Sequence, residues 1–500
     1  MSRELFWRGV GSGCFALASA YLVFSRHRKE AGYESTDQKY PKYQPYISGY
    51  LLPMFLLAVA LYALFHRTAR AANLTLSLCF GVFLHITLYY AVLIFTLPLF
   101  RRTISARACA LLWMIPNYLY IMSQSYMALP KPWLVISVSG NWVWILFSIW
   151  LAGFLAVLSW KTAEHLLFRR RILAGSVPAS EPEILSLWEK TMADAGTKWA
   201  KFPLVVSPHT KTPLSVGLFR RNIKVVLPAK DYCAEELELI FRHEAVHIAR
   251  EDSWSKYFLV FCTAMCWFNP LMWAAMRKSA EDLELSCDET VLLEADEGTR
   301  KKYAVLLLDT AGEERGFTTR LSASAKSLRY RLKNIMNPAG RRSGAAAVGI
   351  TFFVLCMTSG YVALAYGGRS GAERIYPHGD SRQCTVYGLS LSGDGYPADH
   401  ETDYEIADTA AFHSYLSGLT LSELTGNYSF RASGTTCSFR MDTPDNTLYI
   451  ILYDDVMEIT PLPGSPSYYY IAGGTDWEYL NSIIKNPTRA ACTIVPPENI

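Results

Sequence analysis

The stretch Glu238–Asp252 reads ELIFRHEAVHIARED and contains two histidines four residues apart. No Gly or Pro interrupts it, and its apolar residues recur at helical spacing, so the pattern predicts an amphipathic helix. Side chains at positions i and i+4 project from the same face of a helix. His243 and His247 can therefore reach one metal ion, and imidazole nitrogens at this spacing are typical zinc ligands.

The same helix places a carboxylate where burial is expected. Its apolar stripe consists of Leu237, Ile240, Phe241 and Ile248. Glu244 falls within this stripe, where a carboxylate is costly to bury unless something compensates. In an HExxH pattern, the Glu accepts a proton from the water that attacks a peptide carbonyl. We therefore expect a zinc-dependent metalloendopeptidase with one Zn²⁺ per chain and Glu244 as general base. The alternative is a chance pattern on an ordinary helix.

A catalytic zinc of this type needs a third protein ligand. The acidic stretch 277–295 has a helical pattern, with Glu284 and Asp288 spaced i, i+4 on one face. Glu284 could bind zinc while Asp288 orients an imidazole from behind. Glu281 lies near the same face, so spacing alone does not choose between the two glutamates. A solvated acidic helix face is the alternative interpretation.

Two short runs before the helix, PLSVGLF at 213–219 and IKVVLP at 223–228, predict a β-hairpin. Zinc proteases often hold substrate as an added strand, so Val216 and Val225 mark the two candidate substrate strands. After the helix, residues 257–276 are strongly apolar, but Asn269-Pro270 interrupts them. This stretch therefore predicts two apolar helices with a break.

The composition indicates a membrane protein. Hydrophobic residues make up 51% of the 500 residues, charged residues only 18%, and the mean hydropathy is +0.12. Apolar runs predict membrane segments at 9–24, 50–65, 74–100, 108–129, 142–160 and 344–366. The fold expected is therefore a multi-pass α-helical membrane protein. The first segment could instead be a cleaved signal peptide, because ALASA at 16–20 has the small-residue pattern.

The charge distribution predicts the orientation. The basic stretches RHRKE, RRTISAR and FRRR all read as cytoplasmic flanks, whereas Arg67 and Arg70 fall on the opposite side. Residues 367–500 contain 7 Lys/Arg and 17 Asp/Glu, which gives this part a net charge of −10. The rest of the chain therefore carries +14. We expect the 161–343 region inside a bacterial plasma membrane and the acidic tail outside. No basic run interleaved with aromatics predicts direct nucleic-acid binding.

Four units follow from these patterns. They are a five-helix membrane domain at 1–160, a cytoplasmic zinc metalloprotease domain at 161–343, a sixth transmembrane helix at 344–366 and an extracytoplasmic sensor domain at 367–500. The tail is expected to be a small α+β domain with strands in 384–393 and 447–460 and helices in 408–419 and 475–485. It would receive an unidentified extracellular ligand.

An ordered set of motifs resembles the BlaR/MecR family of integral-membrane zinc metallopeptidases. SPHTKTPLSVGLFRRNIKVVLP is followed by the HExxH helix ending in Asp252, then by WFNPLMW and ELSCDE. The resemblance covers roughly 140–340 and implies a gluzincin-like α+β protease domain facing the cytoplasm. It implies His243, His247 and Glu284 as zinc ligands and Glu244 as the base. Asp288 and Asp252 are expected to orient the ligands by hydrogen bonds without binding the zinc themselves.

The resemblance also implies transmembrane signalling, in which the protease cleaves a cytoplasmic protein such as a transcriptional repressor. The chain departs from the best-known members, because its tail is too short for a penicillin-binding domain and no Lys-Thr-Gly follows its Ser482–Lys485 pair. Two alternatives stay open. The chain could be a receptor or scaffold with a structural zinc site, or a quality-control protease for membrane proteins. Homodimer formation also stays open.

The stretch after the acidic helix suggests a second substrate, namely the chain itself. Residues 316–327 are small and polar without apolar periodicity, which predicts an exposed linker. A segment tethered beside a zinc site has a high effective concentration there. Antirepressor members of the family cut themselves in the corresponding region, so we expect self-cleavage between Arg315 and Arg329. A plain linker is the alternative.

Overall fold

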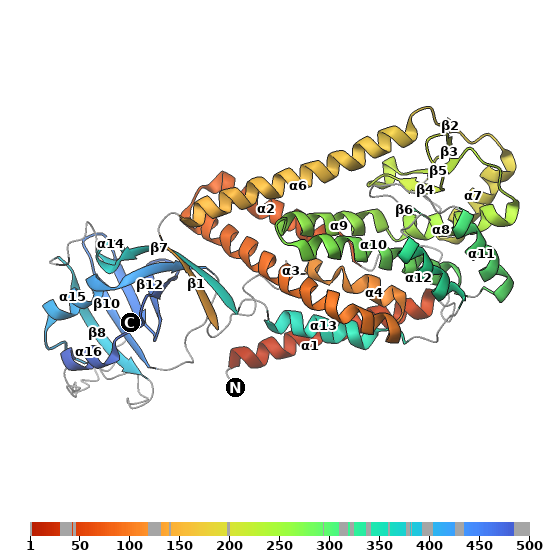
Figure 1. Ribbon diagram of the computed structural model, residues 1–500. Coiled ribbons are helices and arrows are strands. Elements are labelled where there is room, and N and C mark those ends of the chain that lie inside the picture. Colours follow the sequence, from red (N-terminus) through yellow and green to blue (C-terminus); the bar gives the residue numbers. More distant parts are fainter. Residues whose placement is uncertain are drawn as a thin grey trace, which may run out of the picture.

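The computed structural model describes most of the chain in two connected parts (Figure 1). A long helical part carries a small sheet at one end, and a larger C-terminal sheet lies at its other end. The described residues are 3–30, 43, 47–118, 132–139, 142–197, 201–293, 295–309, 319–320, 325–336, 342–358, 361–376, 381, 383–392, 404–425 and 435–484.

Five apolar or long helices form the framework. They are α1 (Arg3–Glu30), α2 (Leu51–His66), α3 (Ala69–Thr103), α6 (Trp142–Leu173) and α13 (Ala345–Thr358). Among the described residues, Ala71–Thr103 and Trp142–Leu173 are long and apolar enough to cross a membrane, whereas α2 and α13 are apolar but shorter. In α6, the side chains of Leu146 and Ile149 are 55% and 57% exposed. Such an apolar surface is better matched to lipid than to water.

Two of the predicted membrane segments need correction. In the segment predicted at 108–129, the described part is the short helix α4 (Ala106–Leu112) followed by the 3₁₀ turn η1 (Ile115–Tyr118), and residues 119–131 lie outside the described ranges. The segment predicted at 344–366 is a helix only as far as Thr358, because strand β7 (Val362–Ser370) begins four residues later. The backbone of β7 is hydrogen-bonded to the neighbouring strand β1 (Leu134–Val138). An apolar run alone does not distinguish such a buried strand from a helix.

The small sheet has five strands in the order β2-β3-β5-β4-β6. Their bounds are β2 (Val177–Pro178), β3 (Leu204–Ser207), β4 (Leu214–Val216), β5 (Lys224–Pro228) and β6 (Thr319–Arg320). The predicted hairpin is confirmed, since β4 pairs antiparallel with β5 and Val216 lies opposite Lys224. Its turn includes η3 (Arg220–Asn222) and Gly217 at φ +138°, where an added Cβ would lie 2.6 Å from the Asn222 carbonyl oxygen.

Six further helices lie between α6 and α13 along the chain. They are α7 (Pro182–Asp194), α8 (Ala234–Ala249), α9 (Asp252–Met265), α10 (Pro270–Val291), α11 (Glu297–Asp309) and α12 (Ala325–Met336). Of these, α8 contacts strand β4 of the small sheet. The HExxH helix is α8, and its predicted apolar stripe is buried, with Phe241 against Trp188 at 5.1 Å between ring centroids. The predicted break is also present, because α9 ends at Met265 and the Asn269 side chain caps α10 at Leu271.

The C-terminal sheet has eight strands in the order β1-β7-β9-β13-β12-β11-β10-β8. Besides β7, its strands are β1 (Leu134–Val138), β8 (Thr385–Ser392), β9 (Thr420–Leu424), β10 (Thr436–Asp442), β11 (Thr447–Leu452), β12 (Val456–Leu462) and β13 (Ser467–Ile471). Its helices are α14 (Gly371–Ile375), α15 (Thr409–Gly418) and α16 (Trp477–Ile483). All four elements expected in the tail are confirmed. The parallel pairing of β1 with β7 was not predicted, and it recruits a segment from the first third of the chain.

Candidate metal centre

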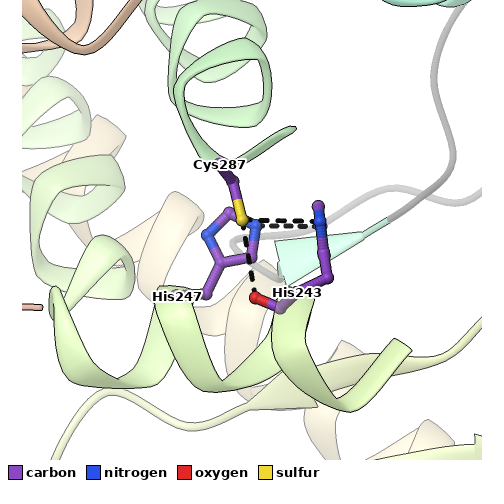
Figure 2. Close-up of side chains that lie close together, drawn as sticks. All are labelled: His243, His247 and Cys287. Atoms are coloured by element: carbon purple, nitrogen blue, oxygen red, sulfur yellow. Dashed lines mark hydrogen bonds between the residues drawn. The ribbon is translucent and has the colours of Figure 1, made fainter. Parts of the chain in front are cut away.

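Helix α8 brings the two predicted histidines together inside the protein. His243 and His247 are 0% and 1% exposed, and their Nε2 atoms lie 3.1 Å apart. Figure 2 shows both rings rising from α8 toward the end of α10. Glu244, on the same helix, is also fully buried. The helical spacing therefore produces the convergence that the sequence predicted.

Helix α10 supplies a carboxylate to the same point. Glu284 Oε2 lies 3.6 Å from His243 Nε2 and 3.7 Å from His247 Nε2. Glu281 instead has a 38% exposed side chain and lies 3.7 Å from Arg101. Of the two glutamates that spacing left open, only Glu284 faces the histidines.

These three side chains fit a zinc ion. Glu284 Oε2 is buried and has no hydrogen-bond partner among the described residues, although it faces two imidazole nitrogens. Two imidazoles and one carboxylate form the ligand set of catalytic zinc sites, which keep the fourth position open. The residues that would hold the ion are therefore His243, His247 and Glu284.

Asp252 fixes the orientation of the His247 ring. Its Oδ2 lies 2.6 Å from His247 Nδ1, and both groups are buried. Burial alone would raise the pKa of Asp252, but Arg250 and His247 lower it. An ionised Asp252 accepts a hydrogen bond from Nδ1–H, which leaves the Nε2 lone pair free for a metal. Asp252 therefore contacts His247, and its role as a support of a metal ligand stays a prediction.

Asp288 reaches His243 mainly through a tyrosine that the sequence did not predict. The Tyr303 hydroxyl donates to Asp288 Oδ1 at 2.7 Å and lies 2.8 Å from His243 Nδ1. Asp288 Oδ1 itself is 3.7 Å from Nδ1. Tyr303 lies on α11, and no motif or spacing in the sequence connects it with the histidines.

Two buried cations stand behind the carboxylates of α10. Lys256 Nζ donates to Glu284 Oε1 at 3.1 Å, and Arg331 lies 3.5 Å from Glu284 Oε2. Burial alone would raise the pKa of Glu284, but the Lys256 ammonium and His247 hold it well below its usual range. Glu284 therefore stays ionised, as a metal ligand must. Neither cation was predicted as part of the site.

Cys287 is a further donor that sequence reasoning missed. Its Sγ lies 3.4 Å from His243 Nδ1, and His243, His247 and Cys287 each place one ligand atom within 4.8 Å of the others (Figure 2). Burial alone would raise the pKa of the thiol, but the two imidazoles lower it. The thiol in the ELSCDE stretch is the sequence signal for this donor.

The candidate substrate strands differ in their neighbours. Strand β5 pairs with β3 on one side and β4 on the other, so Val225 lies in a strand without an edge for an added peptide. Strand β4, which contains Val216, pairs with β5 and, on its other edge, with β6. A small pocket beside β4 is lined by Ser215, Leu218, Arg220, Ile223, His247, Ile248, Glu251, Ser253 and Trp254. Both candidate strands are thus paired on both sides, but the outer neighbour of β4 is only the two-residue strand β6, and Ser215 of β4 lines the pocket that also contains His247.

Comparison with known proteins places the chain in a family of peptidases. The family model described as BlaR1 peptidase M56 matches residues 56–335. The chain is also similar to the regulatory protein BlaR1 of Bacillus licheniformis, with 29% identity over 185 residues. That match covers 37% of this chain and only 30% of the relative.

Proposed function

The chain belongs to the BlaR1 peptidase M56 family, and from this premise we propose that it is a signalling zinc metalloendopeptidase of the bacterial plasma membrane. The observation that carries the proposal is the buried convergence of His243 Nε2, His247 Nε2 and Glu284 Oε2. Glu244 is the proposed general base. Family membership supports a membrane metallopeptidase, and the residue roles are our inference.

The proposed chemistry is hydrolysis of a peptide bond. When bound, zinc would activate a water molecule and polarise the substrate carbonyl. Glu244 accepts the proton of the attacking water and then delivers it to the departing amine. Asp252 holds the His247 ring and the Tyr303–Asp288 pair holds the His243 ring, so that both Nε2 atoms point to the position where the metal would bind. Because the site is buried, these polar groups act with little competition from water.

The substrate is proposed to bind as an antiparallel strand on β4. The chain itself supports this, because β6 pairs antiparallel with β4 and Thr319 lies opposite Ser215. Strand β6 lies within the interval 315–329 in which self-cleavage was predicted. Residues 310–318 and 321–324 lie outside the described ranges. We therefore propose that β4 receives both this segment and a cytoplasmic protein substrate such as a transcriptional repressor.

Two contacts support a path for a signal between the C-terminal sheet and the metal centre. At one end of α3, the Asn73 side chain donates to Glu423 of β9 at 2.8 Å. At the other end, Arg101 donates to Asp282 of α10 at 2.8 Å, two residues from Glu284. Figure 1 shows α3 running between these two regions. We propose that the C-terminal sheet is the extracytoplasmic sensor and that the peptidase part is cytoplasmic, as the charge distribution suggests.

Cys287 favours one alternative function. A His-His-Cys set resembles structural zinc sites, which close their positions with Cys or His. A receptor or scaffold with such a site would not need Glu284 or Glu244 for its activity. Quality control of membrane proteins would share the proposed chemistry and differ only in its substrate.

The test is expression of the wild type and Glu244→Gln in membranes, followed by N-terminal sequencing of any C-terminal fragment. The proposal predicts a fragment that starts within 315–329 in the wild type and is absent from the variant. The same fragment from Glu244→Gln would show that another protease cuts the chain. A wild type that binds zinc but cleaves neither itself nor any candidate regulator would favour the structural alternative.

A further inference from the structure

Arg331 is a fully buried arginine on α12, the helix that leads toward α13. Its Nε and Nη2 donate to the two oxygens of Asp288 at 2.7 and 2.6 Å, which is a bidentate contact. Its Nη1 lies 3.5 Å from Glu284 Oε2. One guanidinium therefore holds both carboxylates that α10 presents at positions i and i+4. The proposed function assigns no role to this residue.

The hydrogen bonds of Asp288 determine where the protons lie on its neighbours. The Tyr303 hydroxyl donates to Asp288 Oδ1 at 2.7 Å, so its single proton points to that oxygen. The Tyr303 oxygen then accepts a hydrogen bond from the Nδ1–H group of His243, 2.8 Å away. In this tautomer the lone pair of His243 lies on Nε2, the atom that faces His247 and Glu284.

We propose that Arg331 and Tyr303 are positioning residues for the zinc site, acting in one chain from Arg331 through Asp288 and Tyr303 to His243. This inference rests on the proposed function, because it assigns these residues to the zinc that His243, His247 and Glu284 would hold. Since Arg331 comes from α12, zinc binding also requires α12 to stay docked on α10. Its Ile335 is buried in the same core as Phe241 and Tyr303.

The two residues allow a sharp test on the full chain in detergent. Zinc dissociation constants are measured by competition with a chromophoric chelator, and folding is checked by size-exclusion chromatography. Arg331→Met and Tyr303→Phe should each weaken zinc binding about 10- to 100-fold, as loss of a ligand's supporting hydrogen bond usually does. Arg331→Lys should recover part of the affinity, because an ammonium can still contact one Asp288 oxygen. Arg329→Met, an exposed arginine on the same helix, is the matched control and should bind like the wild type.

The double variant separates positioning from a merely structural role. If both residues act on His243 through Asp288, Arg331→Met with Tyr303→Phe should lose clearly less than the product of the two single losses. Tyr303→Phe removes one oxygen from a buried ring, so it carries the test even if Arg331→Met does not fold. Wild-type zinc affinity in a folded Tyr303→Phe would overturn the inference while the proposed function stands. A wild type that binds no zinc would overturn both.

Discussion

Replacing Asp252 with alanine should weaken zinc binding while the protein stays folded. The Asp252 side chain is 2% exposed and accepts from His247 Nδ1 at 2.6 Å. Hydrogen bonds to charged groups contribute about 1.5–3 kcal/mol, which corresponds to about 10- to 150-fold in affinity. Loss of a supporting group behind a metal ligand gives about 10- to 100-fold, so the two magnitudes agree.

The assay is a chelator competition on purified wild type, Asp252→Ala and Asp252→Asn. Asparagine keeps an oxygen that can accept from Nδ1, so its loss should be smaller than that of alanine. Glu238→Ala is the control, because Glu238 forms an exposed ion pair with Arg242 on the outer face of α8. An Asp252→Ala protein that is folded and binds zinc as tightly as the wild type would refute the assignment of His247 Nε2 as the ligand atom.

Three further substitutions test other parts of the proposal. Glu244→Gln should retain zinc and lose about 10²- to 10⁴-fold in peptidase rate, whereas loss of the metal would make Glu244 a ligand rather than a base. Trp113→Phe removes the donor 2.7 Å from the buried Asp282 and should lower the free energy of unfolding by about 1–3 kcal/mol. Thermal melting measures this loss, and the 81% exposed Trp133 provides the control, since Trp133→Phe should melt like the wild type. Val216→Pro removes a backbone donor from β4 and should slow cleavage, and a folded variant with unchanged cleavage would exclude β4 as the substrate edge.

Local patterns predicted the elements that carry the site. The unbroken helical spacing around His243 and His247 gave α8, the two β-branched runs gave the β4–β5 hairpin, and Asn269-Pro270 gave the break before α10. Each of these signals lies within about twenty consecutive residues. The same holds for the four tail elements, whose boundaries follow turn and capping residues.

Features that depend on distant segments were not predictable from one sequence. Tyr303 and Arg331 reach the site from α11 and α12, and no spacing rule links them to α8. Strand β1 joins the C-terminal sheet from more than 200 residues upstream of β7. The last membrane segment was overestimated because apolar residues read alike in a helix and in a buried strand.

Zinc X-ray absorption spectroscopy on the purified, zinc-loaded wild type tests the central assignment most directly, because it identifies the atoms bound to the ion. Ligation by His243, His247 and Glu284 predicts a shell of nitrogen and oxygen only, at about 2.0–2.2 Å. A sulfur scatterer at about 2.3 Å would show that Cys287 binds the ion. That result would contradict the proposed catalytic site and favour a structural one.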